Sequence, residues 1–315
     1  MQTPSHQPDP DFLAPDFQLP ATVGTTVARD TVRGPNGPLD PHAVTRAADL
    51  IAEADALVVA AGAGMGVDSG LPDFRGTEGF WRAYPALGQA QVDFYAMASP
   101  QAFIDHPARA WGFYGHRLNL YRATRPHAGF QLLQRWGAAM PQGLAVFTSN
   151  VDGQFQAAGF DPALVHECHG SIRHWQCMLP CCAAIWPAAD AALDVDEALC
   201  LLRGAPPACP HCGGMARPNV LMFGDGQWLS ARSDRQAAAL ARFLSAARRP
   251  VVLEIGAGTA VPSVRHFTAH LLRAHGARLV RINPREPQVP SARDVGLAAG
   301  AGAALAAIAS RIQRG

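Results

Sequence analysis

Lysine is absent from the sequence, so arginine supplies every basic side chain apart from histidine. This absence is typical of a GC-rich coding bias. Charged residues make up only 16% of the 315 residues, and the formal net charge is +1. A chain with so little net charge has no long-range field for nucleic acid or for an anionic membrane surface. We therefore expect neither partner, and we expect charged ligands to be recognised by local side chains.

Long apolar segments are absent as well. No run of 18 or more apolar residues occurs, and the N-terminus lacks a basic segment followed by an apolar one. These absences predict no membrane-spanning helix and no secretory signal, so we expect a cytoplasmic protein. Residues 1–40 are rich in proline, aspartate and glycine without periodicity. We expect them to form an extended or disordered N-terminal segment.

The seven cysteines do not indicate a disulfide framework in an intracellular chain of this length. Five of them cluster in the sequence: Cys177, Cys181, Cys182, Cys209 and Cys212. Two short-spaced pairs can bring four thiolates into a tetrahedron, and four sulfur ligands leave no open position for catalysis. We predict one structural zinc ion held by Cys177, Cys181, Cys209 and Cys212, with Cys182 as the alternative to Cys181. Buried packing thiols are the other interpretation, but an irregular segment gives five cysteines no packing role.

A short apolar run at residues 56–61 predicts a buried parallel strand, and Gly62, Ala63 and Gly64 follow it directly. Glycines at the end of a strand allow a phosphate to approach the backbone. The loop continues as SGLPDFRG at residues 69–76, where Pro72 prevents a regular helix. A strand followed by Gly-x-Gly is a weak signal alone, because an ordinary glycine-rich turn has the same pattern.

Apolar runs alternate with helical patterns along the rest of the chain. Further strands are predicted at residues 143–147, 164–168, 250–255 and 278–282. Helices are predicted at residues 41–54, 100–123, 128–136, 235–247, 263–274 and 298–312, with Asp40 as the N-cap of the first. The alternation predicts an α/β fold with a doubly wound, Rossmann-like parallel sheet built from residues 41–170 and 218–315. Residues 171–217 lose the periodicity and contain the cysteines, so we predict a small zinc-binding module there.

Polar and glycine residues follow the carboxyl ends of the later predicted strands. The carboxyl ends of parallel strands meet at one edge of an open α/β sheet, and ligands bind at that edge. We therefore expect these residues to share one site. They are Ser149, Asn150, Asp152, His169, Gly256, Gly258, Thr259 and Asn283.

The loop GAG followed by SGLPDFRG resembles the signature of the sirtuins, the NAD-dependent protein deacylases. Further segments resemble sirtuin motifs in the same order. They are TSNVD at residues 148–152, His169-Gly170-Ser171, RPNVLMFGD at residues 217–225, GAGTA at residues 256–260, and Ile282-Asn283. The resemblance covers roughly residues 40–312 and implies a deacylase that uses NAD and releases free lysine, nicotinamide and O-acyl-ADP-ribose.

The resemblance also implies roles for individual residues. His169 would be the general base, for which the ordinary pKa of an imidazole near neutrality is suitable. Asn150 and Asp152 would hold the carboxamide of nicotinamide, and Phe74 and Arg75 would close over NAD. The other expected NAD-binding residues are Gly62, Ala63, Gly64, Asp73, Ser149, Gly256, Gly258, Thr259 and Asn283. Val220, Phe223 and Gly224 would bind the acylated protein substrate.

Tyr114 and Arg117 stand three apart on a predicted helix, so both can reach one small anion. A tyrosine hydroxyl beside an arginine fork suits a carboxylate. The segment FYGHR at residues 113–117 resembles the helix with which desuccinylase-type sirtuins recognise acidic acyl groups. The alternative is that Tyr114 belongs to the apolar stripe of the helix and Arg117 is a solvated charge.

Three residues depart from the sirtuin pattern: Gly66 and Ala260 replace serines, and Ser149 replaces a glutamine. Each change removes a polar contact expected around NAD, which implies weaker NAD binding. Two alternative functions therefore stay open. One is transfer of ADP-ribose to protein or to water, and the other is a non-catalytic NAD-binding sensor. The sequence does not indicate an oligomeric state.

Overall fold

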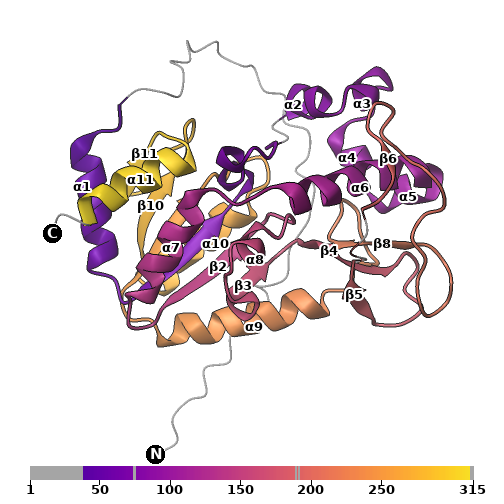
Figure 1. Cartoon of the computed structure of the whole chain (residues 1–315). Coiled ribbons are helices and arrows are strands. Elements are labelled where there is room, and N and C mark those ends of the chain that lie inside the picture. The colour runs from indigo at the N-terminus through magenta and orange to yellow at the C-terminus, as the bar shows by residue number, and fades with distance from the viewer. Residues whose placement is uncertain (1–37, 74–75, 189, 191, 313–315) are drawn as a thin grey trace, which may run out of the picture.

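The computed structural model describes residues 38–73, 76–188, 190 and 192–312, and a six-stranded parallel sheet forms its centre (Figure 1). The strand order is β11-β10-β9-β1-β2-β3. The bounds are β1 Ala56–Ala61, β2 Leu144–Thr148, β3 Val165–Glu167, β9 Pro250–Ile255, β10 Arg278–Ile282 and β11 Val295–Leu297. The chain enters at β1, extends the sheet to β3, and then returns to β9 on the other side of β1. This reversal between β1 and β9 is where open α/β sheets bind ligands.

Helices cover both faces of the sheet (Figure 1). Alternate residues of β1 point to opposite sides, so Leu57 and Val59 pack into one core and Val58 and Ala60 into another. The first core is completed by α1 Pro41–Ala52, α7 Ala128–Ala138 and α11 Ala301–Ile312. The second is completed by α9 Ala231–Ala246 and α10 Ser263–Ala274. The predicted doubly wound α/β fold is therefore confirmed.

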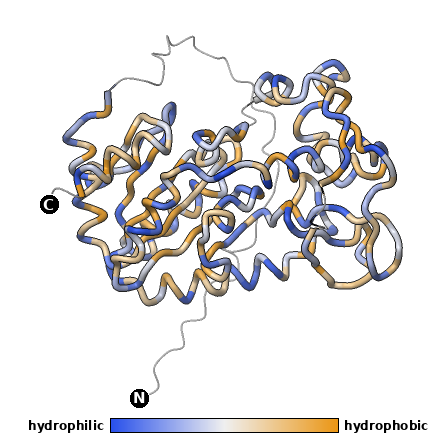
Figure 2. The backbone as a smooth tube through the Cα atoms, viewed as in Figure 1, coloured by the Kyte–Doolittle hydropathy of each residue, from blue (hydrophilic) through white to orange (hydrophobic). Residues whose placement is uncertain are grey.

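The hydropathy of the chain explains this layering. Figure 2 shows mostly apolar colour along the central strands, which are buried on both faces, and an alternation of polar and apolar colour along α9. Helix α1 begins as predicted, because the side chain of Asp40 accepts a hydrogen bond from the His42 N–H at 3.0 Å. Such a cap satisfies one of the backbone donors left open at a helix start.

The helix predicted at residues 100–123 is wrong as a single element. It is two helices, α5 Pro100–Asp105 and α6 Pro107–Ala123. His106 between them has φ −140° and ψ 62°, outside the helical region, because the ring of Pro107 disfavours a helical residue before it. The patterns also missed shorter elements of this part of the chain, α2 Gly76–Ala83, α3 Pro85–Gln89 and α4 Phe94–Met97, as well as β11.

A smaller lobe lies beside the carboxyl edge of the large sheet (Figure 1). Its antiparallel sheet has the order β5-β4-β8, with β4 Gly170–Cys177, β5 Ile185–Pro187 and β8 Ala216–Val220. A separate hairpin pairs β6 Val195–Asp196 with β7 Leu201–Leu202. Helices α2 to α6 share an apolar core with these strands, which includes Phe80, Trp111 and Trp175. Residues 171–217 are thus more regular than the loss of periodicity predicted.

The described residues also form short 3-10 helices and a short α-helix, namely η2 Ala63–Met65, η3 Val67–Ser69, α8 Gln154–Ala157 and η4 Pro162–Leu164. Within the described ranges, no helix is both long and apolar enough to cross a bilayer.

Candidate active site

The loops that follow β1 and β9 meet at the point where the strand order reverses. The Gly62 N–H donates to the Ile255 carbonyl at 2.9 Å, and the Gly64 N–H donates to the Gly256 carbonyl at 3.0 Å. A Cβ atom at Gly62 would lie 2.7 Å from the Ala257 Cα, and one at Gly64 would lie 2.6 Å from the Gly256 Cα. Such distances are too short for any side chain. These glycines are therefore needed for the contact between two loops, a reason that the β1 pattern alone does not reveal.

The loop after β2 is tied to the first glycine loop. The Asn150 Nδ2 donates to the Gly62 carbonyl at 2.9 Å, and the Thr148 Oγ1 donates to the Ala61 carbonyl at 3.0 Å. The Asn150 N–H in turn donates to the Thr148 Oγ1 at 3.0 Å. Thr148 therefore fixes the orientation of Asn150, a role that sequence analysis missed because threonine at a strand end has no distinctive pattern. Ser149 is half-buried between them.

His169 lies two residues after the end of β3 and is 8% exposed. Its Nε2 is 3.1 Å from the Oγ of Ser263, at the start of α10. Burial lowers the pKa of His169 to about 4, and a hydrogen bond with the Ser149 backbone partly opposes that shift. The ring is therefore neutral at neutral pH, and it is a weaker base than an imidazole with its ordinary pKa. This pKa is lower than the near-neutral value expected from the sequence because the sequence does not reveal the burial.

Side chains of α9 hold the strand that leads to His169. Strand β3 is at the edge of the sheet, so within the described part of the chain one side of its backbone has no neighbouring strand. The Glu167 N–H donates to the Gln236 Oε1 at 3.1 Å, and the Glu167 carbonyl accepts from the Ser233 Oγ at 3.0 Å. The buried Glu167 carboxylate also pairs with Arg232. Four contacts from one helix turn, including a 3.4 Å bond from Gln236 Nε2 to the carboxylate, fix a three-residue strand.

Asp152 lies buried in the same region, with one carboxylate oxygen accepting from the Gln154 N–H at 2.8 Å. Burial raises the pKa of Asp152 to about 6, while the Gln154 hydrogen bond and the nearby cations Arg117 and Arg173 lower it. The carboxylate is therefore ionised at neutral pH but close to titration. The loop after β2 is also bonded to α6, because the Gln154 Nε2 donates to the Tyr121 carbonyl at 3.1 Å.

The loops after β9 and β10 are fastened to each other. The Asn283 Nδ2 donates to the Ala257 carbonyl at 2.9 Å, and the Arg265 Nη2 donates to the same carbonyl at 2.9 Å. Arg265 also pairs with Glu286 at 3.3 Å, and the Thr259 Oγ1 lies 3.4 Å from the Glu286 carboxylate. Gly258 lies half-buried between Ala257 and Thr259. Sequence analysis missed Arg265, because only the fold brings it from α10 to these loops.

The long loop after β1 is anchored at several points. The Gly302 N–H at the start of α11 donates to the Asp68 carboxylate at 2.6 Å. Gly66 packs against Leu71, whose Cδ1 would lie 3.1 Å from a Cβ at that position. Asp73 is exposed. Phe74 and Arg75, expected to close over NAD, lie outside the described residues.

The segment after β8 is held by a buried ion pair. The Arg217 Nη1 and Nη2 donate to the two Asp225 oxygens at 2.6 and 2.9 Å, and neither side chain is exposed. This bidentate pair closes the turn that contains Phe223 and Gly224 and begins at Val220. The Phe223 N–H donates to the Ala98 carbonyl at 2.9 Å. The three expected substrate residues are therefore on one rigid turn beside α4.

Arg117 is buried on α6 and only 7% exposed. Its guanidinium carbon lies 5.0 Å from the Phe113 ring centre, 5.7 Å from that of Tyr114 and 5.4 Å from that of Tyr121. The Arg117 Nε donates to the Tyr121 hydroxyl at 2.9 Å. The structure therefore brings Tyr114 and Arg117 together and adds Tyr121, four residues on and one helix turn away.

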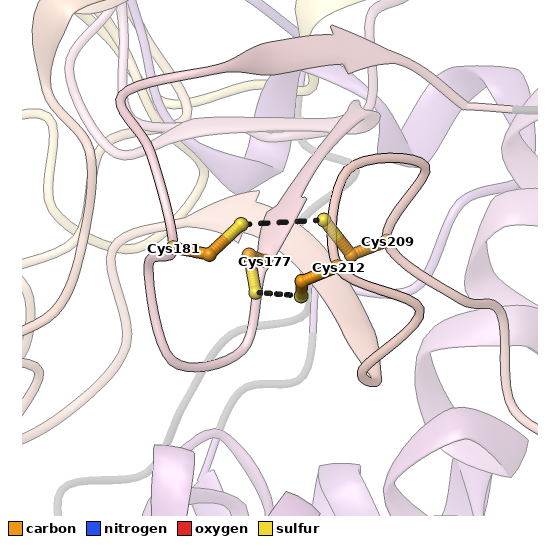
Figure 3. Close-up of side chains that lie close together, drawn as sticks. All are labelled: Cys177, Cys181, Cys209 and Cys212. Atoms are coloured by element: carbon orange, nitrogen blue, oxygen red, sulfur yellow. Dashed lines mark hydrogen bonds between the residues drawn. The ribbon is translucent and has the colours of Figure 1, made fainter.

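Four cysteine side chains point toward one another between β4 and the loop before β8 (Figure 3). The sulfur atoms of Cys177, Cys181, Cys209 and Cys212 all lie within 4.8 Å of one another, and we call this group the cysteine tetrad. Two of the sulfur distances are 3.7 Å (Cys177 to Cys212) and 3.8 Å (Cys181 to Cys209). A zinc–sulfur bond of about 2.3 Å in a tetrahedron gives sulfur atoms about 3.8 Å apart, so the donor set fits Zn²⁺. The exposed Cys182 sulfur lies 3.8 Å from that of Cys181, outside the tetrad.

We expect the fold to lose stability in mild acid because of buried histidines. Burial lowers the pKa of His166 and of His169 to about 4, against about 6.5 in an unfolded chain. Between these values the unfolded state binds more protons, so stability is complete above pH 6.5 and falls as the pH approaches 4. Asp152, with its raised pKa, opposes part of the loss. Urea unfolding at pH 7 and pH 5 should show a lower free energy at pH 5.

The His166→Gln variant isolates one of these groups. Its loss of stability between pH 7 and pH 5 should be about 2 kcal/mol smaller than that of the unmutated protein, because one depressed histidine no longer titrates. An identical pH dependence of the two proteins would contradict the assignment. Both proteins contain the cysteine tetrad, so any effect of acid on the tetrad cancels when their pH dependences are compared.

Comparisons with known proteins identify the family. The model of the Sir2 family matches residues 62–243. The chain is 32% identical over 270 residues to NAD-dependent protein deacylase 2 of Pyrobaculum aerophilum, which covers 85% of this chain and 95% of that relative. It is 31% identical over 259 residues to NAD-dependent protein deacylase 1 of Pseudomonas aeruginosa, and that alignment covers 82% of this chain and 94% of the relative. The chain therefore belongs to the Sir2 family.

Solved structures agree with this assignment. A Sir2 homologue mutant in complex with ADP-ribose aligns with a TM-score of 0.64 at 25% identity, over 85% of this chain and 96% of the other. A Sir2 homologue in complex with NAD aligns with a TM-score of 0.63 at 24% identity, over 85% of this chain and 93% of the other. At this identity the similarity is one of fold.

Proposed function

We propose that this chain, an NAD-dependent protein deacylase of the Sir2 family, removes acyl groups from lysine side chains and prefers acyl groups that end in a carboxylate. The observation that supports deacylation is the neutral, buried His169 at the edge of the sheet where the glycine loops and Asn150 converge. When bound, NAD supplies an activated ribose carbon with nicotinamide as the leaving group. Products are free lysine, nicotinamide and O-acyl-ADP-ribose.

The residues of the site have separate tasks in this proposal. Because the Asn150 Nδ2 is used by the Gly62 carbonyl, we assign its Oδ1 to the carboxamide of nicotinamide. Asp152, ionised at neutral pH, accepts a hydrogen bond from the same carboxamide. His169 takes a proton from a ribose hydroxyl through Nε2, the atom that faces Ser263. The rigid turn around Phe223 binds the backbone of the substrate protein.

The buried guanidinium of Arg117 supports the acidic acyl preference. Burial of a cation is unfavourable unless an anion or oriented dipoles compensate for the lost water. Arg117 is surrounded by three aromatic rings and is close enough to Asp152 to influence its pKa. A succinyl or malonyl carboxylate that enters beside the nicotinamide pocket would meet this cation and the Tyr121 and Tyr114 hydroxyls. A neutral acetyl group gains nothing from it.

The Arg117→Met variant tests the acyl preference. The unmutated enzyme should have a higher kcat/KM on succinyl- or malonyl-lysine peptides than on an acetyl-lysine peptide. The variant should lose about 1.5–3 kcal/mol on the acidic substrates, which is the contribution of a charged hydrogen bond, and reverse the preference. Mass spectrometry of the peptide and NAD products with a panel of acylated peptides measures the preference of the unmutated enzyme and that of the variant. Arg135→Met, which removes an exposed arginine of α7, is the matched control.

Equal or better turnover of the acetyl peptide by the unmutated enzyme would refute the acidic preference and leave deacylation standing. Release of nicotinamide in the absence of any acylated peptide would favour ADP-ribose transfer or NAD hydrolysis instead.

We also propose that the cysteine tetrad holds one structural zinc ion. The distances between its sulfur atoms support this proposal.

A further inference from the structure

The two halves of the cysteine tetrad are joined by a segment that leaves the tetrad and packs on α6. Residues 192–203 of this segment contain the hairpin of β6 and β7, and we call them the strap. The strap lies beside α6 (Figure 1). Its two ends lead to Cys181 on one side and Cys209 on the other, whose sulfur atoms are 3.8 Å apart. The tetrad therefore closes the loop that the strap forms.

Two glycines of α6 allow the strap to contact the helix backbone closely. A Cβ atom at Gly112 would lie 2.3 Å from the Cys200 carbonyl oxygen, and one at Gly115 would lie 3.0 Å from the Val195 Cγ2. Cys200 itself has φ 54°, a left-handed conformation uncommon for residues other than glycine. Such a conformation persists where surrounding contacts hold it. The strap is thus fitted to these two positions of the helix.

Asn119 fastens the strap through both ends of its amide. The Asn119 Nδ2 donates to the Leu193 carbonyl at 2.7 Å, and the Leu193 N–H donates to the Asn119 Oδ1 at 3.1 Å. These two bonds satisfy the backbone of Leu193 as a neighbouring β-strand would. Loss of the amide leaves both backbone groups without partners and frees the strap to shift along α6.

The strap and the buried Arg117 lie on opposite faces of α6. Successive residues of an α-helix are separated by about 100°, so positions i, i+3 and i+7 share one face. Gly112, Gly115 and Asn119 form such a set, in contact with the strap. A second set begins two residues later, about 200° around the helix, and lies in the apolar core or beside it. Its members are Tyr114, Arg117 and Tyr121.

We propose that the strap is a specificity-determining element: it fixes the position of α6 so that Arg117 meets the carboxylate of an acidic acyl group. The inference rests on the proposed preference for such groups. A charged hydrogen bond needs its donor and acceptor at defined positions, and a misplacement of about 1 Å can cost on the order of 100-fold in rate. An acetyl group has no carboxylate to pair with the guanidinium, so a displaced α6 should lower its turnover much less than that of an acidic acyl group. Asn119 and Gly115 are positioning residues in this scheme.

Two variants and one control test the role of the strap. Asn119→Ala removes the fastening, and Gly115→Ala pushes Val195 away by adding one methyl group. In each, kcat/KM on a succinyl-lysine peptide should fall about tenfold, through a higher KM, while kcat/KM on the acetyl peptide changes less than about twofold. Arg203→Gln is the control, because Arg203 pairs with Asp194 and Asp196 within the strap and is 60% exposed. It should leave the ratio of the two values unchanged.

The ratio of kcat/KM on the succinyl peptide to kcat/KM on the acetyl peptide separates a loss of positioning from a general loss of stability. An equal fall on both peptides, or a ratio unchanged in both variants, would overturn the inference. If the unmutated enzyme has no succinyl preference, the proposed function is contradicted, and the inference with it. If the unmutated enzyme has the preference and Asn119→Ala keeps it, only the role of the strap is contradicted. If Asn119→Ala does not fold, Asn119→Asp keeps the acceptor for the Leu193 N–H but sets a carboxylate oxygen against the Leu193 carbonyl, which repels it. Its ratio should fall as in Gly115→Ala.

Discussion

Replacement of His169 by alanine should abolish deacylation while NAD binding is largely retained. In the proposed mechanism the neutral imidazole of His169 is the general base, and its Nε2 is 3.1 Å from the Ser263 Oγ. Loss of a general base lowers the rate by about 100-fold or more. The glycine loops, Asn150 and the loops after β9 and β10 keep their own contacts, so the NAD dissociation constant should change little. Single-turnover kinetics and calorimetry measure the two quantities separately.

His42→Ala supplies the control for loss of an imidazole, because His42 is exposed on α1. Its kinetics should match those of the unmutated enzyme. A fall in activity of less than about tenfold in His169→Ala would mean that another residue is the base, since a general base contributes more. An unchanged phenotype in cells would instead favour a sensor that binds NAD without turning it over.

Removal of the proposed zinc ion should unfold the segment around the cysteine tetrad and lower activity indirectly. The tetrad joins β4 to the loop before β8, and the strap between its halves contacts α6. In small metal-binding modules the free energy of metal binding is folding free energy, on the order of 10 kcal/mol. Chelation should therefore remove about one zinc ion per chain and expose residues 177–212 to hydrogen exchange, while the strands of the large sheet stay protected.

Two cysteine variants make this test specific. Cys209→Ser should lose zinc and activity together, whereas Cys182→Ser should keep both, because the Cys182 sulfur is exposed and outside the tetrad. Metal analysis that finds no zinc in carefully prepared protein would refute the metal assignment. Loss of zinc in Cys182→Ser but not in Cys181→Ser would exchange the two ligands.

Much of the fold follows from local patterns. β1 and the start of α1 are predictable because their signals lie in adjacent residues: six apolar residues before a glycine, and an aspartate before a proline. The break at Pro107 was also present in the sequence, but the apolar stripe continues across it and hides it. β11 is too short for a periodic pattern, with three residues.

The sequence predicts which residues share the site but not the contacts that hold them there. His169, Asn150 and Asp152 follow strands in the sequence, so their shared edge can be inferred from topology. The contact between His169 and Ser263 joins residues 94 positions apart, and no local signal indicates it. The same holds for Arg265, whose bond to Ala257 depends on the packing of α10. Burial, which sets the low pKa of His169, is likewise a property of the assembled fold.

The contacts of α9 with β3 have a consequence for solubility. A strand at the border of a sheet presents unpaired backbone groups on which a strand of another molecule can add, which leads to aggregation. In β3 the Glu167 N–H and carbonyl are already bonded to Gln236 and Ser233. An incoming strand would have to displace α9 before it could pair. His169 therefore lies beside a border strand whose outward backbone groups at Glu167 are already used within the fold and are closed to self-association.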